Sequence, residues 1–176
     1  MPNLYILCGP SGCGKSTWRD NFIKEHSEDD IRYVSRDEIR FSMLKEGENY
    51  FAHEKEVFKQ FVNTLAQTLV DGFDVIADAT HLNLASRNKL LNAIDNQIPD
   101  CDYTIKYVVF YTSMVDCIQR DDAREGLAHV GSEVIQGMFR SFEAPTLKED
   151  SRANEIIEVG DSKDDFTYLI APYWKG

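Results

Sequence analysis

Apolar residues along the chain fall into short continuous runs that alternate with stretches of helical periodicity. The runs are rich in β-branched and aromatic residues, which predicts strands at residues 4–7, 31–35, 73–78, 103–111 and 155–159. The clearest helical stripe is formed by Phe58, Phe61, Val62, Leu65 and Leu69. We expect helices at residues 18–25, 36–45, 51–72, 83–98 and 133–142. A further helix is expected to begin at residue 113 or 116 and to end at residue 125.

Strands that alternate with helices along a chain predict an α/β fold, with a parallel sheet and helices on both faces. No repeat, low-complexity tract or linker-like change of composition interrupts the pattern, so we expect one domain over residues 1–176. Ligands bind to such sheets at the carboxyl ends of the strands. Three of the expected strands are followed directly by polar segments, at residues 9–16, 35–40 and 78–83. We expect these three segments to lie close together.

The first segment, Gly-Pro-Ser-Gly-Cys-Gly-Lys-Ser at residues 9–16, matches the phosphate-binding motif G-x-x-x-x-G-K-[ST] without a mismatch. It lies between a strand and a helix, where backbone N–H groups and a helix N-terminus together bind phosphate. We expect Lys15 to contact the β- and γ-phosphates of ATP and the Ser16 hydroxyl to bind Mg²⁺. The alternative is a glycine-rich turn without a ligand. The predicted nucleotide-binding residues of this loop are Gly9, Ser11, Gly12, Cys13, Gly14, Lys15, Ser16 and Thr17.

Composition limits the cellular compartment and the binding partners that we expect for this domain. A hydrophobic share of 43% is enough for a sizeable core, and no apolar stretch approaches the roughly 20 residues of a membrane span. The net charge of −11 argues against broad binding to polyanions, although it is compatible with a small basic site inside a cleft. No secretory signal is visible, so we expect a cytoplasmic protein. The cysteines form no metal-binding pattern and are expected to be free thiols: Cys8, Cys13, Cys101 and Cys117.

The second segment, Ser35-Arg-Asp-Glu-Ile-Arg40, has a functional and a structural interpretation. In the functional one, Asp37 accepts the proton of an attacking hydroxyl, while Arg36 or Arg40 holds the acceptor. In the structural one, Ser35 and Glu38 form a capping box. Asp37 and Arg40 would then be only an i,i+3 ion pair.

The third segment, Asp78-Ala-Thr-His-Leu-Asn83, follows an apolar strand. An acid at such a strand end resembles a Walker-B residue, which supports Mg²⁺ through water. The alternative is an ordinary strand-end Asp78, with Asn83 serving only as a helix cap. His81 has no metal-ligand partners in the pattern, and we expect it to be structural.

Two arginines, Arg120 and Arg124, have i,i+4 spacing on an expected helix, where like charges repel unless a phosphate lies between them. Such a pair on a mobile lid would bind the donor phosphates and exclude water from the reaction. The alternative is a solvated helix face, on which Asp116, Asp121 and Glu125 neutralise both arginines.

Cys13 lies inside the glycine-rich motif and close to an expected helix N-terminus. Helix N-termini stabilise thiolates and lower the thiol pKa, which predicts that alkylation of Cys13 blocks activity and that ATP protects it. The alternative is that Cys13 is only a small residue tolerated in a tight turn.

The four motifs together resemble, in order over residues 1–145, the kinase domain of the phage polynucleotide 5′-hydroxyl kinase family. They are Gly-Pro-Ser-Gly-Cys-Gly-Lys-Ser-Thr-Trp, Ser-Arg-Asp-Glu-Ile-Arg, Asp-Ala-Thr-His-Leu-Asn and Arg-x-x-x-Arg. The resemblance implies a P-loop NTPase fold, a three-layer α/β/α sandwich with a mainly parallel central sheet and a helical lid at about 116–145. It also implies ATP as the phosphate donor and Mg²⁺ as the metal.

The resemblance also assigns roles to residues of this chain. Asp37 is the implied general base, and Arg40 contacts the phosphate of the acceptor. The implied catalytic residues are Lys15, Asp37, Arg120 and Arg124, and the two arginines also bind the donor. The implied metal site is Ser16 with Asp78. The implied acceptor-binding residues are Arg36, Asp37, Arg40, Asp78, Thr80 and Asn83.

The chain departs from the family pattern in two places. We expect no counterpart of the phosphatase domain that is fused to the phage enzyme. The Asp-Thr-Asn pattern expected after the third strand reads Asp78-Ala-Thr80-His81 instead.

These features predict a kinase that moves the γ-phosphate of ATP to a hydroxyl, foremost the 5′-OH end of a nucleic acid. The net charge of −11 keeps a second hypothesis open, a kinase for a sugar, nucleoside, antibiotic or similar small molecule. A third hypothesis is an ATP-binding switch or NTPase subunit without an acceptor, whose slow hydrolysis a partner stimulates. The expected partners are thus ATP or ADP and the acceptor, with no membrane.

Overall fold

The apolar runs of the sequence pair side by side in one five-stranded parallel sheet. The computed structural model describes residues 1–160. The strands are β1 (Asn3–Cys8), β2 (Arg32–Ser35), β3 (Val75–Asp78), β4 (Thr104–Tyr111) and β5 (Glu155–Gly160). They are arranged in the order β2-β3-β1-β4-β5. Strands β1, β3 and β4 are almost entirely buried, which explains why their sequences are continuous apolar runs and not alternating ones.

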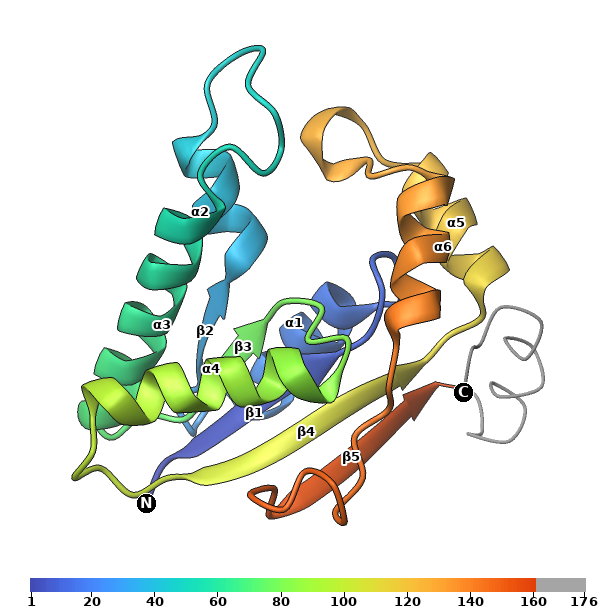
Figure 1. The fold of residues 1–176 in the computed structure, drawn as a ribbon. Coiled ribbons are helices and arrows are strands. Elements are labelled where there is room, and N and C mark those ends of the chain that lie inside the picture. Colours follow the sequence, from blue (N-terminus) through green and yellow to red (C-terminus); the bar gives the residue numbers. More distant parts are fainter. Residues whose placement is uncertain (161–176) are drawn as a thin grey trace.

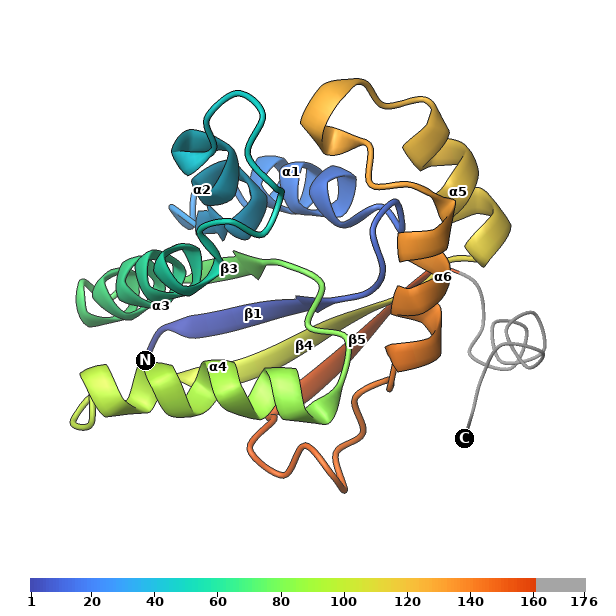
Figure 2. The same ribbon diagram turned by 45° about the horizontal axis from the view of Figure 1, so that its top comes forward.

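Helices cover both faces of the sheet. They are α1 (Lys15–Glu25), α2 (Arg36–Met43), α3 (Glu54–Val70), α4 (Leu84–Gln97), α5 (Met114–Asp122) and α6 (Ser132–Ser141). Helix α1 lies on one face, while α3 and α4 pack together on the other (Figure 1, Figure 2). The predicted three-layer α/β/α sandwich is therefore confirmed. No helix within residues 1–160 is long and apolar enough to cross a membrane.

Helices α5 and α6, with the loop between them, form a segment that we call the lid segment (residues 114–141). It stands beside the carboxyl ends of the strands and faces α2 and the loop after it across a gap (Figure 1). A short 3₁₀ helix, Gly126–Ala128, lies in its loop. The lid segment lies where the sequence places a helical lid. The C-terminal tail, to which the sequence assigns no element, lies outside the described residues.

Local capping bonds set where several helices begin. The Ser35 hydroxyl accepts a bond from the Glu38 N–H at 3.3 Å, so β2 turns directly into α2. Asn83 and Ser86 form a reciprocal capping box at the start of α4, with the Asn83 side chain accepting from the Ser86 N–H at 2.9 Å. Ser113 caps α5. The predicted cap of α4 by Asn83 is thus confirmed, whereas Ser35 caps α2 without the reciprocal bond of the Glu38 side chain that a capping box requires.

Helix boundaries differ from the expectation by up to three residues, and two of these differences have a visible cause. Helix α3 begins at Glu54 and not at residue 51, because residues 50–53 form a turn. Helix α5 ends at Asp122 and not at residue 125. Its end follows from the buried Asp121 carboxylate, which accepts bonds from the N–H groups of Val130 (3.0 Å) and Gly131 (2.8 Å). These bonds fold the lid loop back onto the end of α5.

A buried ion pair ties α4 to the segment before β5. Arg87 Nε donates to Asp150 Oδ1 at 2.7 Å and Arg87 Nη2 donates to Asp150 Oδ2 at 3.0 Å, with both side chains fully buried. Arg87 Nη1 donates to the Glu143 carbonyl at 2.9 Å. Charges without water need partners of this kind, so the pair fixes the loop that leads from the lid segment to β5.

We expect Asp150→Ala to lower the free energy of unfolding by about 3–5 kcal/mol, because it leaves a buried guanidinium without its counter-charge. The matched control is Glu155→Ala, which removes the half-exposed partner of Lys106 and is expected to cost less than about 1 kcal/mol. Urea unfolding of the three proteins measures both values. Equal losses of unfolding free energy in the two variants would contradict the conclusion that the buried pair of Arg87 and Asp150 stabilises the fold more than an exposed pair does.

Candidate functional site

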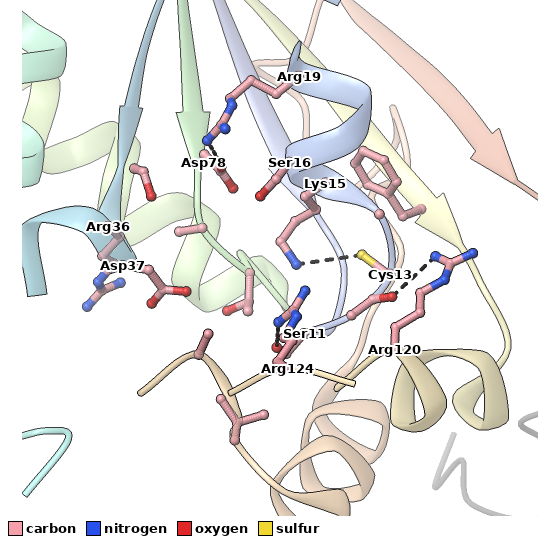
Figure 3. Close-up of a pocket in the computed structure, with 18 of the residues that line it drawn as sticks. Ser11, Cys13, Lys15, Ser16, Arg19, Arg36, Asp37, Asp78, Arg120 and Arg124 are labelled. Carbon is pink, nitrogen blue, oxygen red and sulfur yellow. Dashed lines mark hydrogen bonds and ion pairs between the residues drawn. The ribbon is translucent and has the colours of Figure 1, made fainter. Parts of the chain in front are cut away.

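A cleft with a volume of about 1250 Å³ opens at the carboxyl edge of the sheet (Figure 3). The loop before α1, the start of α2, the end of β3 and the lid segment all contribute to its lining. It brings together most of the residues predicted from the sequence: Ser11, Gly12, Cys13, Gly14, Lys15, Ser16, Thr17, Arg36, Asp37, Arg40, Asp78, Thr80, Arg120 and Arg124. Gly9 and Asn83 do not line it.

Glycine is required at two positions of the loop between β1 and α1. Gly12 and Gly14 have φ angles of +81° and +100°, a region that other residues rarely adopt. A Cβ on Gly12 would also lie 2.4 Å from the carbonyl oxygen of Cys117. Gly14 precedes α1, whose N-terminus has no side-chain cap and no acid in its first turn. This helix N-terminus is therefore suited to an anion from outside the chain.

Lys15 folds over this loop. Its Nζ donates to the carbonyl oxygens of Gly9 at 3.0 Å and Pro10 at 2.7 Å, and no carboxylate pairs with it among residues 1–160. Gly9 itself has a packing role, since its N–H donates to the Thr80 carbonyl at 2.9 Å and a Cβ there would lie 2.6 Å from Cys13 Sγ. The ammonium group of Lys15 is thus held at the cleft without an anionic partner.

The Cys13 thiol does not have the lowered pKa that its position predicts. The residue is only 3% exposed, and burial raises the pKa of its thiol in spite of the nearby Lys15 ammonium. The expected effect of the helix N-terminus is outweighed by desolvation of the thiolate. The expectation of a low thiol pKa is therefore wrong, and Cys13 packs against Gly9 as part of the loop.

The two lid arginines point to the loop before α1. Arg120 Nη1 donates to the Gly12 carbonyl at 3.3 Å, and Arg124 Nη1 donates to the Ser11 hydroxyl at 3.2 Å (Figure 3). Because α5 ends at Asp122, Arg124 lies beyond the helix and the two do not share one helix face as expected. Neither forms an ion pair with a described residue, so the predicted neutralised surface is not found.

On the opposite wall, Asp37 belongs to a network of charged groups. Its Oδ1 accepts from the Tyr50 hydroxyl at 2.7 Å and from Arg40 Nη1. Arg40 is 5% exposed and also donates to Tyr50 and, through Nε and Nη2, to both oxygens of Glu54. Glu54 accepts from Arg36 as well. The Asp37 carboxylate nevertheless lines the cleft, with 61% of its side chain exposed.

All three nitrogens of the Arg40 guanidinium donate to protein atoms in this network. Arg40 therefore holds Asp37 and Glu54 in place. Arg36 is more available, because only its Nη2 is bonded and 26% of its side chain is exposed. Burial, followed by the charge of Asp37, raises the pKa of Tyr50, which keeps this hydroxyl protonated as a donor.

Asp78 lies at the end of β3, where its Oδ2 accepts from Arg19 Nη1 at 2.7 Å. Burial raises the pKa of the Asp78 carboxyl, and the charges of Lys15 and Arg19 oppose this shift. No described residue donates to Oδ1. Ser16 lies nearby at the start of α1 (Figure 3). A hydroxyl and a free carboxylate oxygen are ligands that Mg²⁺ accepts, so these two residues fit a magnesium site.

Three residues of this arrangement give no recognisable signal in the sequence. Arg19 lies in α1 and pairs with an acid 59 positions away, which no local pattern reveals. Tyr50 and Glu54 lie in and after a turn, and they reach Asp37 and Arg40 only because α2 and α3 pack together.

The charges of the cleft are divided between its two walls. Six lysines and arginines line it against four acids, an excess of two positive charges in a chain with a net charge of −11. Arg19, Arg36 and Arg40 are paired with carboxylates. Lys15, Arg120 and Arg124 bond only to uncharged groups. The wall formed by the glycine-rich loop and the lid segment therefore carries the cations of the cleft that no carboxylate neutralises.

His81 lies behind the cleft. It is 5% exposed with a φ of +39°, and its Nδ1 contacts the Leu7 carbonyl oxygen at 2.7 Å. That contact places the proton on Nδ1. Burial lowers the pKa of His81 to about 4, so the ring is neutral at pH 7. The expectation that His81 is structural agrees with this burial.

Comparisons with known proteins identify a family and several solved structures to which this chain is similar. A family model described as an AAA domain matches residues 4–145, and a search of curated proteins gave no match. A crystal structure of a fungal RNA kinase is similar, with a TM-score of 0.64 and 13% identity over 99% of this chain and 89% of that one. A sugar kinase from Janibacter sp. HTCC2649 has a TM-score of 0.62 and 12% identity over 98% and 94%.

A chain in the structure of the Pnkp1/Rnl/Hen1 RNA repair complex is also similar. Its TM-score is 0.63 and its identity 24%, over 78% of this chain but only 42% of that one. The shared feature of these structures is a kinase-like P-loop fold, which implies nucleotide binding. The acceptors named for the kinases differ, so the fold does not select one.

The neutral state of His81 makes stability depend on pH. Its folded pKa of about 4 lies below the ordinary value of 6.5, so the unfolded chain takes up a proton that the folded protein excludes. This contribution is fully present above pH 6.5 and is lost as the pH falls toward 4. We expect wild type to lose about 2 kcal/mol more than His81→Asn between pH 7 and pH 5.

Urea unfolding at several pH values measures this difference. Asparagine is the chosen replacement because it tolerates a positive φ. Parallel curves for the two proteins would show that His81 is not held neutral by burial.

Proposed function

The chain belongs to the AAA domain family, and we propose that it is a kinase that transfers the γ-phosphate of ATP to the 5′-hydroxyl end of a nucleic acid. One observation carries the proposal. The cleft has the glycine-rich loop and three unpaired cations on one wall and the Asp37 carboxylate on the other. A phosphoryl group bound to the first wall and a hydroxyl bound to the second would face each other.

The donor side binds the triphosphate of ATP. Backbone N–H groups of the loop and of the α1 N-terminus contact the phosphates, and Lys15 turns from its carbonyl contacts to the β- and γ-phosphates. Arg120 and Arg124 approach the same phosphates from the lid segment and balance the charge that spreads over the transferred group. Mg²⁺, held by Ser16 and Asp78, would supply further neutralisation of the phosphate oxygens.

The acceptor side orients the hydroxyl. Asp37 accepts the hydroxyl proton as the new bond to phosphorus forms and the bond from the γ-phosphorus to the bridging oxygen breaks, which releases ADP. Arg40 and Tyr50 fix the carboxylate. Arg36 is the cation for an acceptor phosphate, since its Nη1 has no partner among the described residues. Thr80 lines the same cleft, whereas Asn83 caps α4, so we assign Asn83 no contact with the acceptor.

The choice of a nucleic acid rests on the motif order of the sequence and on the similarity to a fungal RNA kinase. A second candidate is a small-molecule kinase. It is favoured by the net charge of −11 and by the similarity to a sugar kinase. The two candidates share the donor side and the role of Asp37, and they differ only in the acceptor.

We expect Asp37→Asn to lower the transfer of labelled γ-phosphate to a 5′-hydroxyl oligonucleotide by about 100-fold or more, the usual contribution of a general base. Binding of ATP should persist, because Asp37 lies on the other wall. Asp100→Asn, an exposed acid outside the cleft, is the matched control and should retain full activity. Transfer by Asp37→Asn within a few-fold of wild type would remove the proposed base.

Salt dependence distinguishes the two acceptor classes. If the protein contacts two phosphates of a single-stranded acceptor, its KM for the oligonucleotide should rise about 7-fold between 50 and 200 mM salt. The KM for ATP, measured in parallel, is the reference for effects on the donor side. Label transfer to a neutral sugar or nucleoside, without salt dependence and without labelling of the oligonucleotide, would support the small-molecule kinase instead.

A further inference from the structure

A large aromatic ring lies exposed on the acceptor wall. Phe51 lines the cleft and is 60% exposed, although burial of such a ring normally stabilises a fold. It follows Tyr50 in the turn between α2 and α3. The ring therefore lies where an acceptor would enter.

The position of Phe51 is well defined by its neighbours. Its N–H donates to Asn49 Oδ1 at 2.9 Å, and the Ala52 N–H donates to the Asn49 carbonyl at 2.9 Å, which closes the turn. The Tyr50 ring packs at 84° to Phe51, with 4.8 Å between the centroids, and at 68° to Phe41. The exposed ring is thus part of a packed aromatic group and is held at the cleft.

A hydrogen bond joins this aromatic group to Asp37. The Tyr50 hydroxyl donates to Asp37 Oδ1 at 2.7 Å, and Tyr50 contacts Phe51 with its ring. The Arg40 guanidinium lies 4.5 Å from the Tyr50 centroid and 6.0 Å from that of Phe51. A hydroxyl held by Asp37 would therefore carry its attached group toward an aromatic face.

We propose that Phe51 stacks on the base of the terminal nucleotide that presents its 5′-hydroxyl to Asp37. Proteins hold unpaired bases in this way, on exposed aromatic side chains beside cations. Every base has an aromatic face, so the contact requires a base without selecting one of the four. The inference rests on the proposed function and adds the determinant that separates nucleotide acceptors from sugars.

The test compares two acceptors, a short 5′-hydroxyl oligonucleotide and the same strand with an abasic 5′-terminal residue. The variants are Phe51→Ala, Phe51→Leu, which keeps an apolar side chain without the ring, and Phe51→Trp, which keeps a stacking face. Leu147→Ala is the matched control, since Leu147 is 59% exposed and lies outside the cleft lining.

We expect Phe51→Ala and Phe51→Leu to lower kcat/KM for the intact strand about 10-fold, mainly through KM, because a stacking contact is lost. The abasic strand should be a poor acceptor for wild type and equally poor for both variants. Phe51→Trp should retain the preference of wild type for the intact strand, and Leu147→Ala should match wild type.

Equal losses on both acceptors, or no loss on either, would overturn the stacking role while leaving the kinase intact. Failure of wild type to label either strand would overturn the proposed function, and the inference with it. Full activity of Phe51→Leu with a retained preference for the intact strand would show that the ring is not the determinant.

Discussion

Parallel pairing of β2, β3 and β1 is the constraint on which the cleft depends. Ser35 lies opposite Asp78 in the register of β2 and β3, and Ile6 lies opposite Ala77 in that of β1 and β3. Because all carboxyl ends meet at one edge, three segments far apart in the sequence begin side by side. The capping bond of Ser35 then starts α2 at once, which places Asp37 two residues from the sheet edge.

Charge pairing gives the two walls of this cleft different properties. Carboxylates neutralise Arg36 and Arg40 on one wall, whereas Lys15 and the lid arginines contact only uncharged groups on the other. The wall whose cations lack carboxylate partners is suited to a triphosphate. The wall whose cations are neutralised is suited to a hydroxyl group on an acceptor that carries few charges. An overall acidic chain can therefore bind a strongly anionic donor, since fields within a cleft are local.

Sequence reasoning predicted the sheet and the glycine-rich loop, and most of its candidate site residues line the cleft, because these depend on local periodicity and spacing. It could not predict which partner each charge takes. The pairs of Arg19 with Asp78 and of Arg87 with Asp150 join distant segments, and the five bonds of Arg40 depend on how α2 meets α3. The thiol of Cys13 was mispredicted for the same reason, since burial is a tertiary property.

The central claim is that Asp37 holds the hydroxyl that attacks the terminal phosphate. A crystal structure with ADP, aluminium fluoride and a 5′-hydroxyl oligonucleotide tests it most directly. The account predicts the 5′-oxygen within roughly 2.6–3.2 Å of an Asp37 oxygen and in line with the aluminium and the leaving oxygen. An acceptor oxygen elsewhere in the cleft, with Asp37 turned away from it, would contradict the account.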